Sequence, residues 1–438
     1  MPQFLISARW IVPVEPAGAV LENHAVAVRD GVIEKVLPAS EASRFSGYEE
    51  VHLENHVLIP GLVNAHTHAA MSLMRGLADD LPLMRWLQEH IWPAETRHVS
   101  PEFVRDGTAL ACAEMLLGGI TTFNDMYFFP EAALDAALAA GLRSAHGMIV
   151  IDFPSAYASD ADDYLRKGLD LRDRRGGEPL ASFCFAPHAP YTVSDPALRK
   201  IATLAAELDV PVHVHLHETA EEIERSVAEH GVRPLERFAR LGLLGPNLIA
   251  VHCVHLEPQE IAALARHGCS VVHCPSSNLK LASGFSPIEE LRTKGVNVAL
   301  GTDGAASNNR LDLFQEMRTA ALLAKAVAGD AQALPAHAAL RAATLGGAQA
   351  LGLASRIGSI AAGKAADLVA VEMRAPHLAP IYDPVSHLVY AAGREDVSHV
   401  WVAGRPLVTG RKLQNAAWEQ LETRARMWQN SLKSNADS

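Results

Sequence analysis

Through its whole middle part, the chain alternates short apolar runs with longer alanine- and leucine-rich stretches, and this alternation limits the folds open to it. The longer stretches, such as residues 101–117 and 131–140, read as helices. Eight apolar runs have the length of buried strands: residues 57–68, 120–126, 143–150, 182–190, 210–218, 248–255, 270–275 and 296–303. Strands that alternate with helices build parallel sheets, so eight such units predict an α/β fold, a closed (β/α)8 TIM barrel.

The two ends of the chain show a different sequence pattern, in which short predicted strands are separated by turn signals. Apolar runs flank Asp30-Gly31, and Asp-Gly in that position is a strong hairpin signal. Similar runs occur at residues 366–371 and 397–402. Because the ends of a domain usually lie close together, we expect both to pair in one small β-sandwich. The predicted domains are the β-sandwich, residues 1–57 and 365–438, and the catalytic barrel, residues 58–364.

Charge and cysteine content exclude several classes of partner. The formal net charge of −12 disfavours binding to a nucleic-acid backbone, and no uninterrupted basic run offsets it. No apolar run is long enough to cross a bilayer, so no membrane association is expected. The 5 cysteines are odd in number and irregularly spaced, without a Cys-X-X-Cys pair, which predicts a reduced, cytoplasmic setting.

Titratable residues collect at the ends of the predicted strands. They are His66, His68, Asp125, His188, His215, Glu218, His252, His255, His273 and Asp303. Any one of them alone is more often a loop or capping residue. Scattered core histidines, however, have no reason to fall at the same end of successive strands. Because the chemistry of a barrel sits at the C-terminal ends of its strands, the set predicts a metal centre at the barrel mouth.

The first two candidate metal ligands are histidines on the first predicted strand. His66 and His68 are separated by one residue, a spacing that places both imidazoles on one face of a strand. Together with one histidine of the fifth strand and Asp303, they provide three neutral imidazoles and a carboxylate, a set suited to zinc or ferrous iron. In the fifth strand, alternation places three histidines on one side, so spacing alone leaves the ligand open: His213, His215 and His217.

Four motifs together resemble the amidohydrolase superfamily and, within it, the methylthioadenosine/S-adenosylhomocysteine deaminases, close to the triazine hydrolases. They are PGLVNAHTH at residues 60–68, HLHE at 215–218, HCVH at 252–255 and LGTDG at 300–304. The resemblance extends over nearly the whole chain, including both β-rich ends. Further support comes from IWPAE at residues 91–95, APHAPY at 186–191 and GAASNN at 304–309.

The resemblance implies a role for each residue that matches a motif. The implied ligands of a single divalent metal, zinc or alternatively iron, are His66, His68, His215 and Asp303. Glu218 is the implied proton shuttle, His252 the residue that holds the metal-bound water, and Asp303 the acceptor of its proton. The implied substrate contacts are Glu95 on the ribose hydroxyls and His188, with Glu218 and Asp303 at the ring. Relatives with two metals carry a lysine near the end of the fourth strand, and residues 183–188 contain none.

The reaction that follows is hydrolytic deamination of the adenine ring of a small-molecule nucleoside, with release of ammonia and the inosine analogue. We favour 5′-methylthioadenosine, with S-adenosylhomocysteine and adenosine as further candidates. The apolar side chains of residues 71–92 suit a thioether tail, although an ordinary amphipathic helix packed on the barrel explains most of them equally. Arg75 and Arg85 suit the carboxylate of a homocysteine tail, and surface solvation explains them as well.

Two alternative reactions would use the same predicted site. One is deamination of a free base such as guanine or cytosine, and another is displacement of chloride from a triazine; Glu95 argues against both, since only ribose hydroxyls require it. A non-catalytic assembly protein is disfavoured because every ligand position is filled. Nucleic-acid deamination is excluded because the chain lacks the Pro-Cys-X-X-Cys signature and a basic groove. The resemblance also implies a homo-oligomer, whose contact surface the sequence does not identify.

Overall fold

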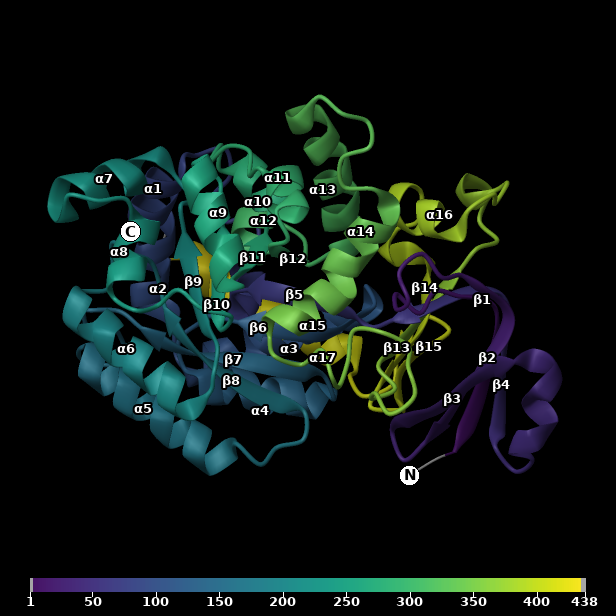
Figure 1. Ribbon diagram of the computed structural model, residues 1–438. Helices are drawn as coiled ribbons and strands as arrows, with labels where there is room; N and C mark the ends of the chain where they lie inside the picture. Colours follow the sequence, from purple (N-terminus) through teal and green to yellow (C-terminus); the bar gives the residue numbers. More distant parts are fainter. Residues whose placement is uncertain (1–2, 435–438) are drawn as a thin grey trace.

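The computed structural model describes residues 3–434, and within this range the strands form two sheets (Figure 1). One sheet has eight parallel strands in chain order: β5 (Leu62–Thr67), β6 (Ile120–Asp125), β7 (Arg143–Val150), β8 (Ala181–Pro187), β9 (Val212–Leu216), β10 (Leu248–His252), β11 (Ser270–His273) and β12 (Asn297–Leu300). The chain just after β12 returns to β5, where the Asp303 N–H donates to the His66 carbonyl at 3.0 Å. The TIM barrel predicted from the sequence is confirmed.

Helices connect the strands and cover the outside of the barrel. They are α3 (Pro101–Leu117), α4 (Pro130–Ala140), α5 (Ala161–Arg175), α6 (Asp195–Leu208), α7 (Ala220–His230), α8 (Pro234–Arg240), α9 (Pro258–His267), α10 (Pro275–Lys280), α11 (Ile288–Thr293), α12 (Ala305–Asn308), α13 (Leu313–Ala328) and α14 (Ala336–Arg341). Short polar side chains begin several of them; the Ser100 hydroxyl accepts the Phe103 N–H, and Thr219 accepts the Glu222 N–H. Strands such as β7 are buried along their whole length because helices cover one face and the barrel interior the other.

The end of the barrel opposite the strand C-termini is filled. Helix α15 (Gly347–Ala350) and the π-turn before it, Ala342–Gly346, pack against the start of β5 and β12. A Cβ at Gly347 would lie 2.7 Å from the Val63 side chain, so this close approach requires glycine. Access to the barrel interior is therefore from the C-terminal ends of the strands.

The second sheet joins both ends of the chain. Its strands are β1 (Phe4–Ile11), β2 (Leu21–Arg29), β3 (Val32–Pro38), β4 (Glu49–Pro60), β13 (Leu368–Glu372), β14 (Val397–Val402), β15 (Arg405–Thr409) and β16 (Lys412–Leu413). Antiparallel β4 and β13 join the two ends, with Val57 opposite Val371. The sheet curls so that the Phe4 and Trp401 rings stack at 6.4 Å. The predicted pairing of the two ends in one β-sandwich unit is confirmed.

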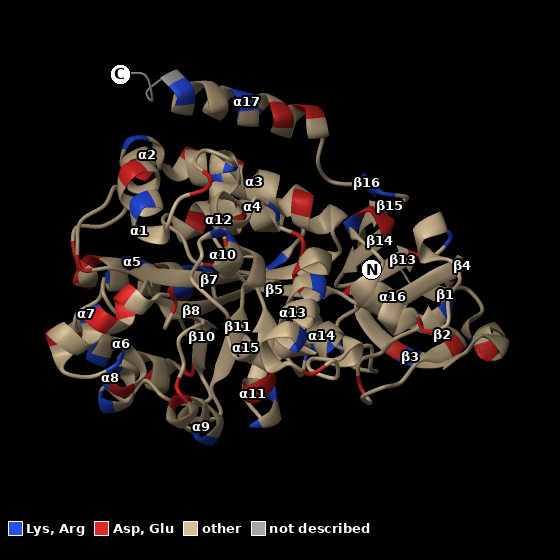
Figure 2. Ribbon diagram, turned by 90° about the horizontal axis from the view of Figure 1, so that it is seen from above, with Lys and Arg blue, Asp and Glu red and all other residues tan. Residues whose placement is uncertain are grey.

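Two elements differ from the sequence expectations. The run at residues 57–68 is not one strand, because β4 ends at Pro60 in one sheet and β5 begins at Leu62 in the other. The chain crosses between them at Gly61, where any side chain would collide with Thr121. Within the C-terminal segment, helix α17 (Trp418–Ser434) leaves the sheet and lies along the barrel (Figure 2), where its Trp428 indole donates to Asp106 of α3 at 3.0 Å.

Three shorter elements follow β5 and form part of the cavity described below. They are the 3-10 helix at Ala69–Met74, helix α1 (Leu83–Trp86) with the π-turn Leu87–Ile91, and helix α2 (Trp92–His98). Helix α16 (Pro384–Tyr390) packs on the opposite side, against α13 and α14. No helix within residues 3–434 is long and apolar enough to span a membrane.

Candidate metal centre and active site

The four side chains predicted as metal ligands meet at the ends of β5, β9 and β12. One donor atom from each of His66, His68, His215 and Asp303 lies within 4.8 Å of the others. Asp303 Oδ1 is 3.2 Å from His66 Nε2 and 3.1 Å from His68 Nε2. His215 Nε2 is 3.2 Å from His66 Nε2. Three imidazole nitrogens and one carboxylate oxygen thus converge on a single point.

The other ring nitrogen of each of these histidines already has a partner. His68 Nδ1 donates to the Met126 carbonyl at 2.6 Å, and His215 Nδ1 donates to the His188 carbonyl at 2.7 Å. His66 Nδ1 faces His213 Nε2 at 2.8 Å. A neutral imidazole with its proton on Nδ1 presents a lone pair at Nε2, which is how histidine binds a metal. The facing Nε2 lone pairs of His66 and His215 repel each other unless a cation lies between them.

The electrostatics of the four residues also favour a cation. Burial lowers the pKa of His66 to about 4 and that of His215 well below its ordinary value, so both imidazoles are neutral at pH 7. Burial opposes ionisation of Asp303, but contacts with His66 and His68 hold its pKa well below the ordinary value. Burial opposes protonation of His68, but its contacts with Asp303 raise the pKa of its imidazole to about 9, so a positive charge is favoured beside this buried carboxylate, and a metal ion there takes the place of that proton. The residues present therefore fit one divalent metal ion.

The carboxylate of Asp303 is held in place by its second oxygen. Asp303 Oδ2 accepts hydrogen bonds from the hydroxyls of Ser277 and Ser307, both at 2.7 Å. The backbone of Asp303 has a left-handed φ of 59°, an uncommon conformation for a residue that is not glycine. These contacts fix Oδ1 toward the histidines, so the site is organised by residues of α10 and α12 that are not themselves ligands.

Glu218 and His252 lie beside the ligands. Glu218 Oε2 is 3.8 Å from His252 Nε2, and burial raises the pKa of the Glu218 carboxyl. The Nδ1 of His252 donates to Asn278 Oδ1 at 2.8 Å, which turns Nε2 toward Glu218. A buried glutamate with a raised pKa holds a proton more readily than a solvated one, which suits a group that acts as general acid and base.

A second carboxylate clamps the backbone before Glu218. The two oxygens of Glu222, the fourth residue on, accept the N–H groups of His217 and Glu218 at 2.8 and 2.9 Å. His217 has a left-handed φ of 56°, so the chain turns sharply as it leaves β9. The Glu222 side chain, itself buried at the first turn of α7, holds this strained turn in place.

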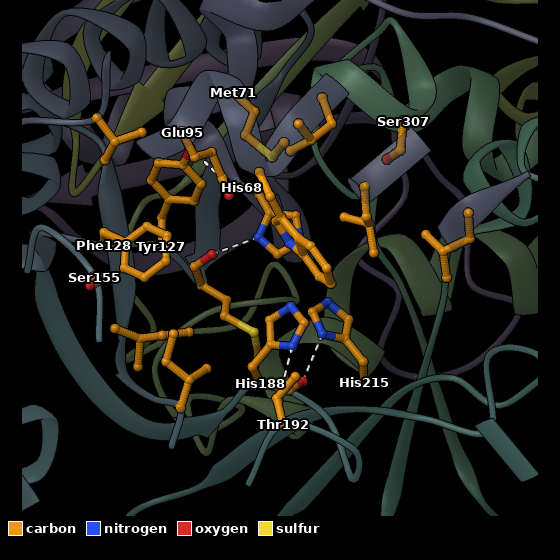
Figure 3. Close-up of a pocket in the computed structure, with 18 of the residues that line it drawn as sticks. His68, Met71, Glu95, Tyr127, Phe128, Ser155, His188, Thr192, His215 and Ser307 are labelled. Atoms are coloured by element: carbon orange, nitrogen blue, oxygen red, sulfur yellow. Dashed lines mark hydrogen bonds between the residues drawn. The ribbon is translucent and has the colours of Figure 1, made fainter. Parts of the chain in front are cut away.

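One cavity of about 370 Å³ is lined by His68, His215, Glu218, His252 and Asp303 (Figure 3). His68 lies between the pair Glu95 and Tyr127 on one side and His188 and His215 on the other. The Tyr127 hydroxyl donates to Glu95 Oε1 at 2.7 Å, and burial raises the pKa of Glu95 to about 7. Burial lowers the pKa of His188 to about 3, so this imidazole is neutral. Apolar side chains make up much of the remaining wall: Met71, Leu83, Trp86, Leu87, Ile91, Trp92, Ile151, Phe153 and Leu281.

Other predicted strand-end residues lie outside this group. The expectation that alternation keeps His217 beside His215 is wrong, because β9 ends at Leu216 and the His217 ring bonds to the Leu235 N–H and the His255 carbonyl. The His255 ring bonds to the Ser283 carbonyl, and Asp125 accepts the Ala69 N–H. These residues hold loops together and do not line the cavity.

The two arginines considered for a substrate carboxylate also lie elsewhere. Arg75 pairs with Glu114, and Arg85 pairs with Glu89 on its own helical segment at 3.1 Å. Neither lines the cavity.

Sequence reasoning missed several contributors to the site, and three of them have a signal in the chain. Tyr127 follows the second strand end directly, Ser307 lies inside the GAASNN motif, and Glu222 stands four residues after Glu218. Ser277 carries no comparable signal, since only the packing of α10 brings it to Asp303. His213 has the spacing of a ligand but contacts the ligand His66 instead.

Comparison with known proteins shows which family these motifs belong to. The family model described as "Amidohydrolase family" matches residues 57–407. The 5-methylthioadenosine/S-adenosylhomocysteine deaminase of Saccharophagus degradans is 51% identical over 97% of this chain and 96% of its own length. The enzyme of the same name from Teredinibacter turnerae is 48% identical over 98% of this chain and 97% of its own length.

Solved structures agree with this placement. An adenosine deaminase from Xanthomonas campestris with bound zinc has a TM-score of 0.96 and 52% identity and covers 99% of both chains. Atrazine chlorohydrolase from Arthrobacter aurescens, complexed with zinc, has a TM-score of 0.91 and 23% identity and covers 97% of this chain and 99% of its own. At that identity the second similarity concerns the fold alone.

Proposed function

Because the chain belongs to the amidohydrolase family, as its motifs predicted, we propose that it is a zinc-dependent deaminase of adenine nucleosides. The reaction removes the 6-amino group of 5′-methylthioadenosine and yields the inosine analogue and ammonia. S-adenosylhomocysteine and adenosine are further candidate substrates. The observation that carries the proposal is the convergence of His66, His68, His215 and Asp303 beside the buried Glu218. The named deaminases with up to 51% identity over nearly the full length support it.

We propose His66, His68, His215 and Asp303 as the ligands of one zinc ion. When bound, zinc acts as a Lewis acid and lowers the pKa of a water molecule from about 15.7 toward about 7. The outer partners of the ligands, His213, the Met126 carbonyl and the His188 carbonyl, set the direction of each imidazole.

The side chains around the ligands move the protons. The protonated Glu218 carboxyl donates its proton to N1 of the adenine ring while water adds at C6; His252 orients that water, and Asp303 accepts one of its protons. Asp303 then passes this proton to the amino group, the C6–N bond breaks, ammonia leaves, and the remaining hydroxyl proton at C6 returns to Glu218 as the C6=O bond forms. Glu218 suits this role because burial raises its pKa and because the clamp from Glu222 fixes its backbone. His252 is held in one tautomer by Asn278.

Glu95 and His188 are the proposed contacts to the rest of the nucleoside. One oxygen of Glu95 accepts from Tyr127, which leaves the other for ribose hydroxyls. A free base has no group that requires this carboxylate, and neither has a triazine. The position of Glu95 within the same cavity as Glu218 therefore favours a nucleoside over those alternatives.

An ammonia-release screen tests the proposal. The zinc-loaded protein is assayed with methylthioadenosine, S-adenosylhomocysteine, adenosine, guanine, cytosine and a chlorotriazine. We expect release from methylthioadenosine above all and none from the free bases or the triazine. Release from free bases only would overturn the nucleoside assignment, and a screen in which every compound stays intact would overturn the deaminase assignment.

The proposed setting is the cytoplasm. All five cysteines are free and buried: Cys112, Cys184, Cys253, Cys269 and Cys274. A chain of this size without disulfides suits a reducing compartment. The homo-oligomer implied by the family resemblance stays a prediction, and sedimentation of the zinc-loaded protein measures it.

A further inference from the structure

A buried carboxyl group on α13 joins two other helices, α10 and α12. Glu316 lies in the first turn of α13 and is only 1% exposed. Its Oε2 accepts the backbone N–H of Ser276, at the start of α10, at 3.1 Å. Its Oε1 accepts the side-chain amide of Asn308, the last residue of α12, at 2.9 Å. One side chain thus ties the short helices α10 and α12 to the long helix α13.

The residues beside these two partners hold the carboxylate of Asp303. Ser277 follows Ser276 in α10, and its hydroxyl donates to Asp303 Oδ2 at 2.7 Å. Ser307 precedes Asn308 in α12, and its hydroxyl donates to the same oxygen at 2.7 Å. The buried carboxyl group on α13 is therefore connected to Asp303 through α10 on one side and through α12 on the other.

The connection through α12 has little freedom to move. The side-chain nitrogen of Asn308 donates to Glu316 Oε1 and also to the Thr302 carbonyl, which it meets at 2.7 Å. An amide nitrogen carries two hydrogens, so both bonds form at once and fix the side chain in one orientation. Helix α12, with Ser307, is thereby held between Glu316 and the backbone that follows β12.

The position of Glu316 is unfavourable for a carboxyl group apart from these bonds. Burial raises its pKa to about 7, and the nearby Asp312 adds to the rise, while the hydrogen bonds from Ser276 and Asn308 oppose it. Burying a carboxyl group is costly unless hydrogen bonds compensate. Packing alone therefore does not account for a glutamate at this place, whereas the two bonds to α10 and α12 do.

From this network we propose that Glu316 is a positioning residue of the metal centre, which sets Ser277 and Ser307 and through them the orientation of the Asp303 carboxylate. The inference rests on the proposed function, in which Asp303 is a zinc ligand. Partners of a ligand that fix its orientation contribute to metal affinity. Without Glu316, α10 and α12 lose their common anchor, the two hydroxyls lose their fixed places, and Asp303 Oδ1 is no longer held toward the histidines.

The chain offers a matched control on the same helix. Asp312 is the N-cap of α13 and is 3% exposed, and its Oδ1 accepts the N–H groups of Phe314 and Gln315 at 3.1 and 3.2 Å. The change Asp312→Ala therefore removes two hydrogen bonds of a buried carboxyl group, as Glu316→Ala does. Both of its bonds, however, lie within α13, so its loss destabilises the helix without releasing α10 or α12.

The test measures zinc affinity by competition with a chelator, and stability by urea unfolding, in the parent and both variants. We expect Glu316→Ala to lower zinc affinity about tenfold, as for other residues that orient a ligand. Asp312→Ala should lower stability and leave zinc affinity unchanged. Parent zinc affinity in Glu316→Ala would overturn the inference, whatever its stability. An equal loss of zinc affinity in Asp312→Ala would also overturn it, because any damage to α13 would then loosen the site.

A second comparison tests the route through the two serines. In a Ser277→Ala/Ser307→Ala background the hydroxyls are absent, so the further change Glu316→Ala should alter zinc affinity by about twofold or less. A loss as large as in the parent would show that Glu316 acts by another route, and the inference would be wrong.

Glu316→Gln covers the case in which Glu316→Ala does not fold. Its amide keeps one acceptor but places N–H hydrogens against the other donor, so one of the two links breaks and zinc affinity should fall by a smaller factor. Parent zinc affinity in Glu316→Gln would then overturn the inference. Zinc affinity requires no substrate, so these outcomes are separate from the ammonia-release screen. A parent protein that binds no zinc would refute the proposed metal centre itself.

Discussion

Replacement of Glu222 by alanine tests whether the backbone clamp before Glu218 positions the proposed proton shuttle. The change removes both acceptors of the His217 and Glu218 N–H groups, which lie at 2.8 and 2.9 Å from the Glu222 carboxylate. A buried donor left without a partner costs about 1–3 kcal/mol. For two such groups, the free energy of unfolding should fall by about 2–6 kcal/mol. Glu222→Gln keeps one acceptor and should recover part of the loss.

The catalytic effect should appear in kcat and not in KM. Glu222 does not line the cavity, whereas Glu95 and His188 do, so substrate binding stays intact. Release of the strained turn at His217 lets Glu218 leave its place, and we expect kcat to fall about 10²-fold, as for a misplaced catalytic group.

Urea unfolding and steady-state ammonia release measure the two effects in the zinc-loaded protein. Glu224→Ala is the control, because this glutamate lies on the same helix, α7, but is exposed, and both its stability and its kcat should match the parent. A Glu222→Ala protein with lowered stability and an unchanged kcat would show that the clamp supports the fold without positioning Glu218. A variant unchanged in both would refute the reasoning.

The other predictions concern the proton shuttle, the ligand partner and the nucleoside contact. Glu218→Gln should retain one zinc ion per chain by elemental analysis and lose turnover about 10²–10⁴-fold; activity at the parent level would refute its role. His213→Ala removes the partner of the His66 Nδ1 atom. Competition with a chelator should show that the zinc affinity of this variant is lowered about 10–100-fold. An unchanged zinc affinity would show that His213 only packs inside the barrel and does not orient His66. Burial raises the pKa of Glu95 to about 7, so its carboxylate is lost as the pH falls through 7, and KM for methylthioadenosine should rise below that pH. Glu95→Gln should abolish this dependence of KM, and a rise that persists in the variant would assign it to another group.

Much of the fold follows from patterns that lie within short segments. Buried parallel strands need apolar side chains on both faces, so β10 reads as a continuous apolar run up to its last residue, His252. The Asp30-Gly31 turn is equally local, since glycine takes the left-handed φ of 81° that the hairpin requires. The sequence also indicates where such strands end, and the barrel topology brings the C-terminal ends of all of them to one rim.

The chain near Gly61 shows where local pattern is insufficient. Apolar residues lie on both sides of Pro60-Gly61, and this turn signal does not by itself indicate that the chain leaves one sheet for another. The crossing is set by Thr121, which packs so closely that only glycine fits. Helix α17 is a similar case, because its place along the barrel depends on Asp106, more than three hundred residues earlier.

The sequence by itself determined the residue types of the metal centre and the strands that carry them, because spacing and strand ends are local properties. Spacing left open which of the three histidines of the fifth strand turns toward Asp303, and the family resemblance named His215. The structure gives the physical reason, because a left-handed residue at His217 ends the alternation and His213 contacts His66 instead. The structure alone showed that Arg75 and Arg85 are paired elsewhere and that much of the cavity wall is apolar. The physical reason is that charges and cavities arise from contacts between segments far apart in the chain, whereas strands and helices arise from neighbours.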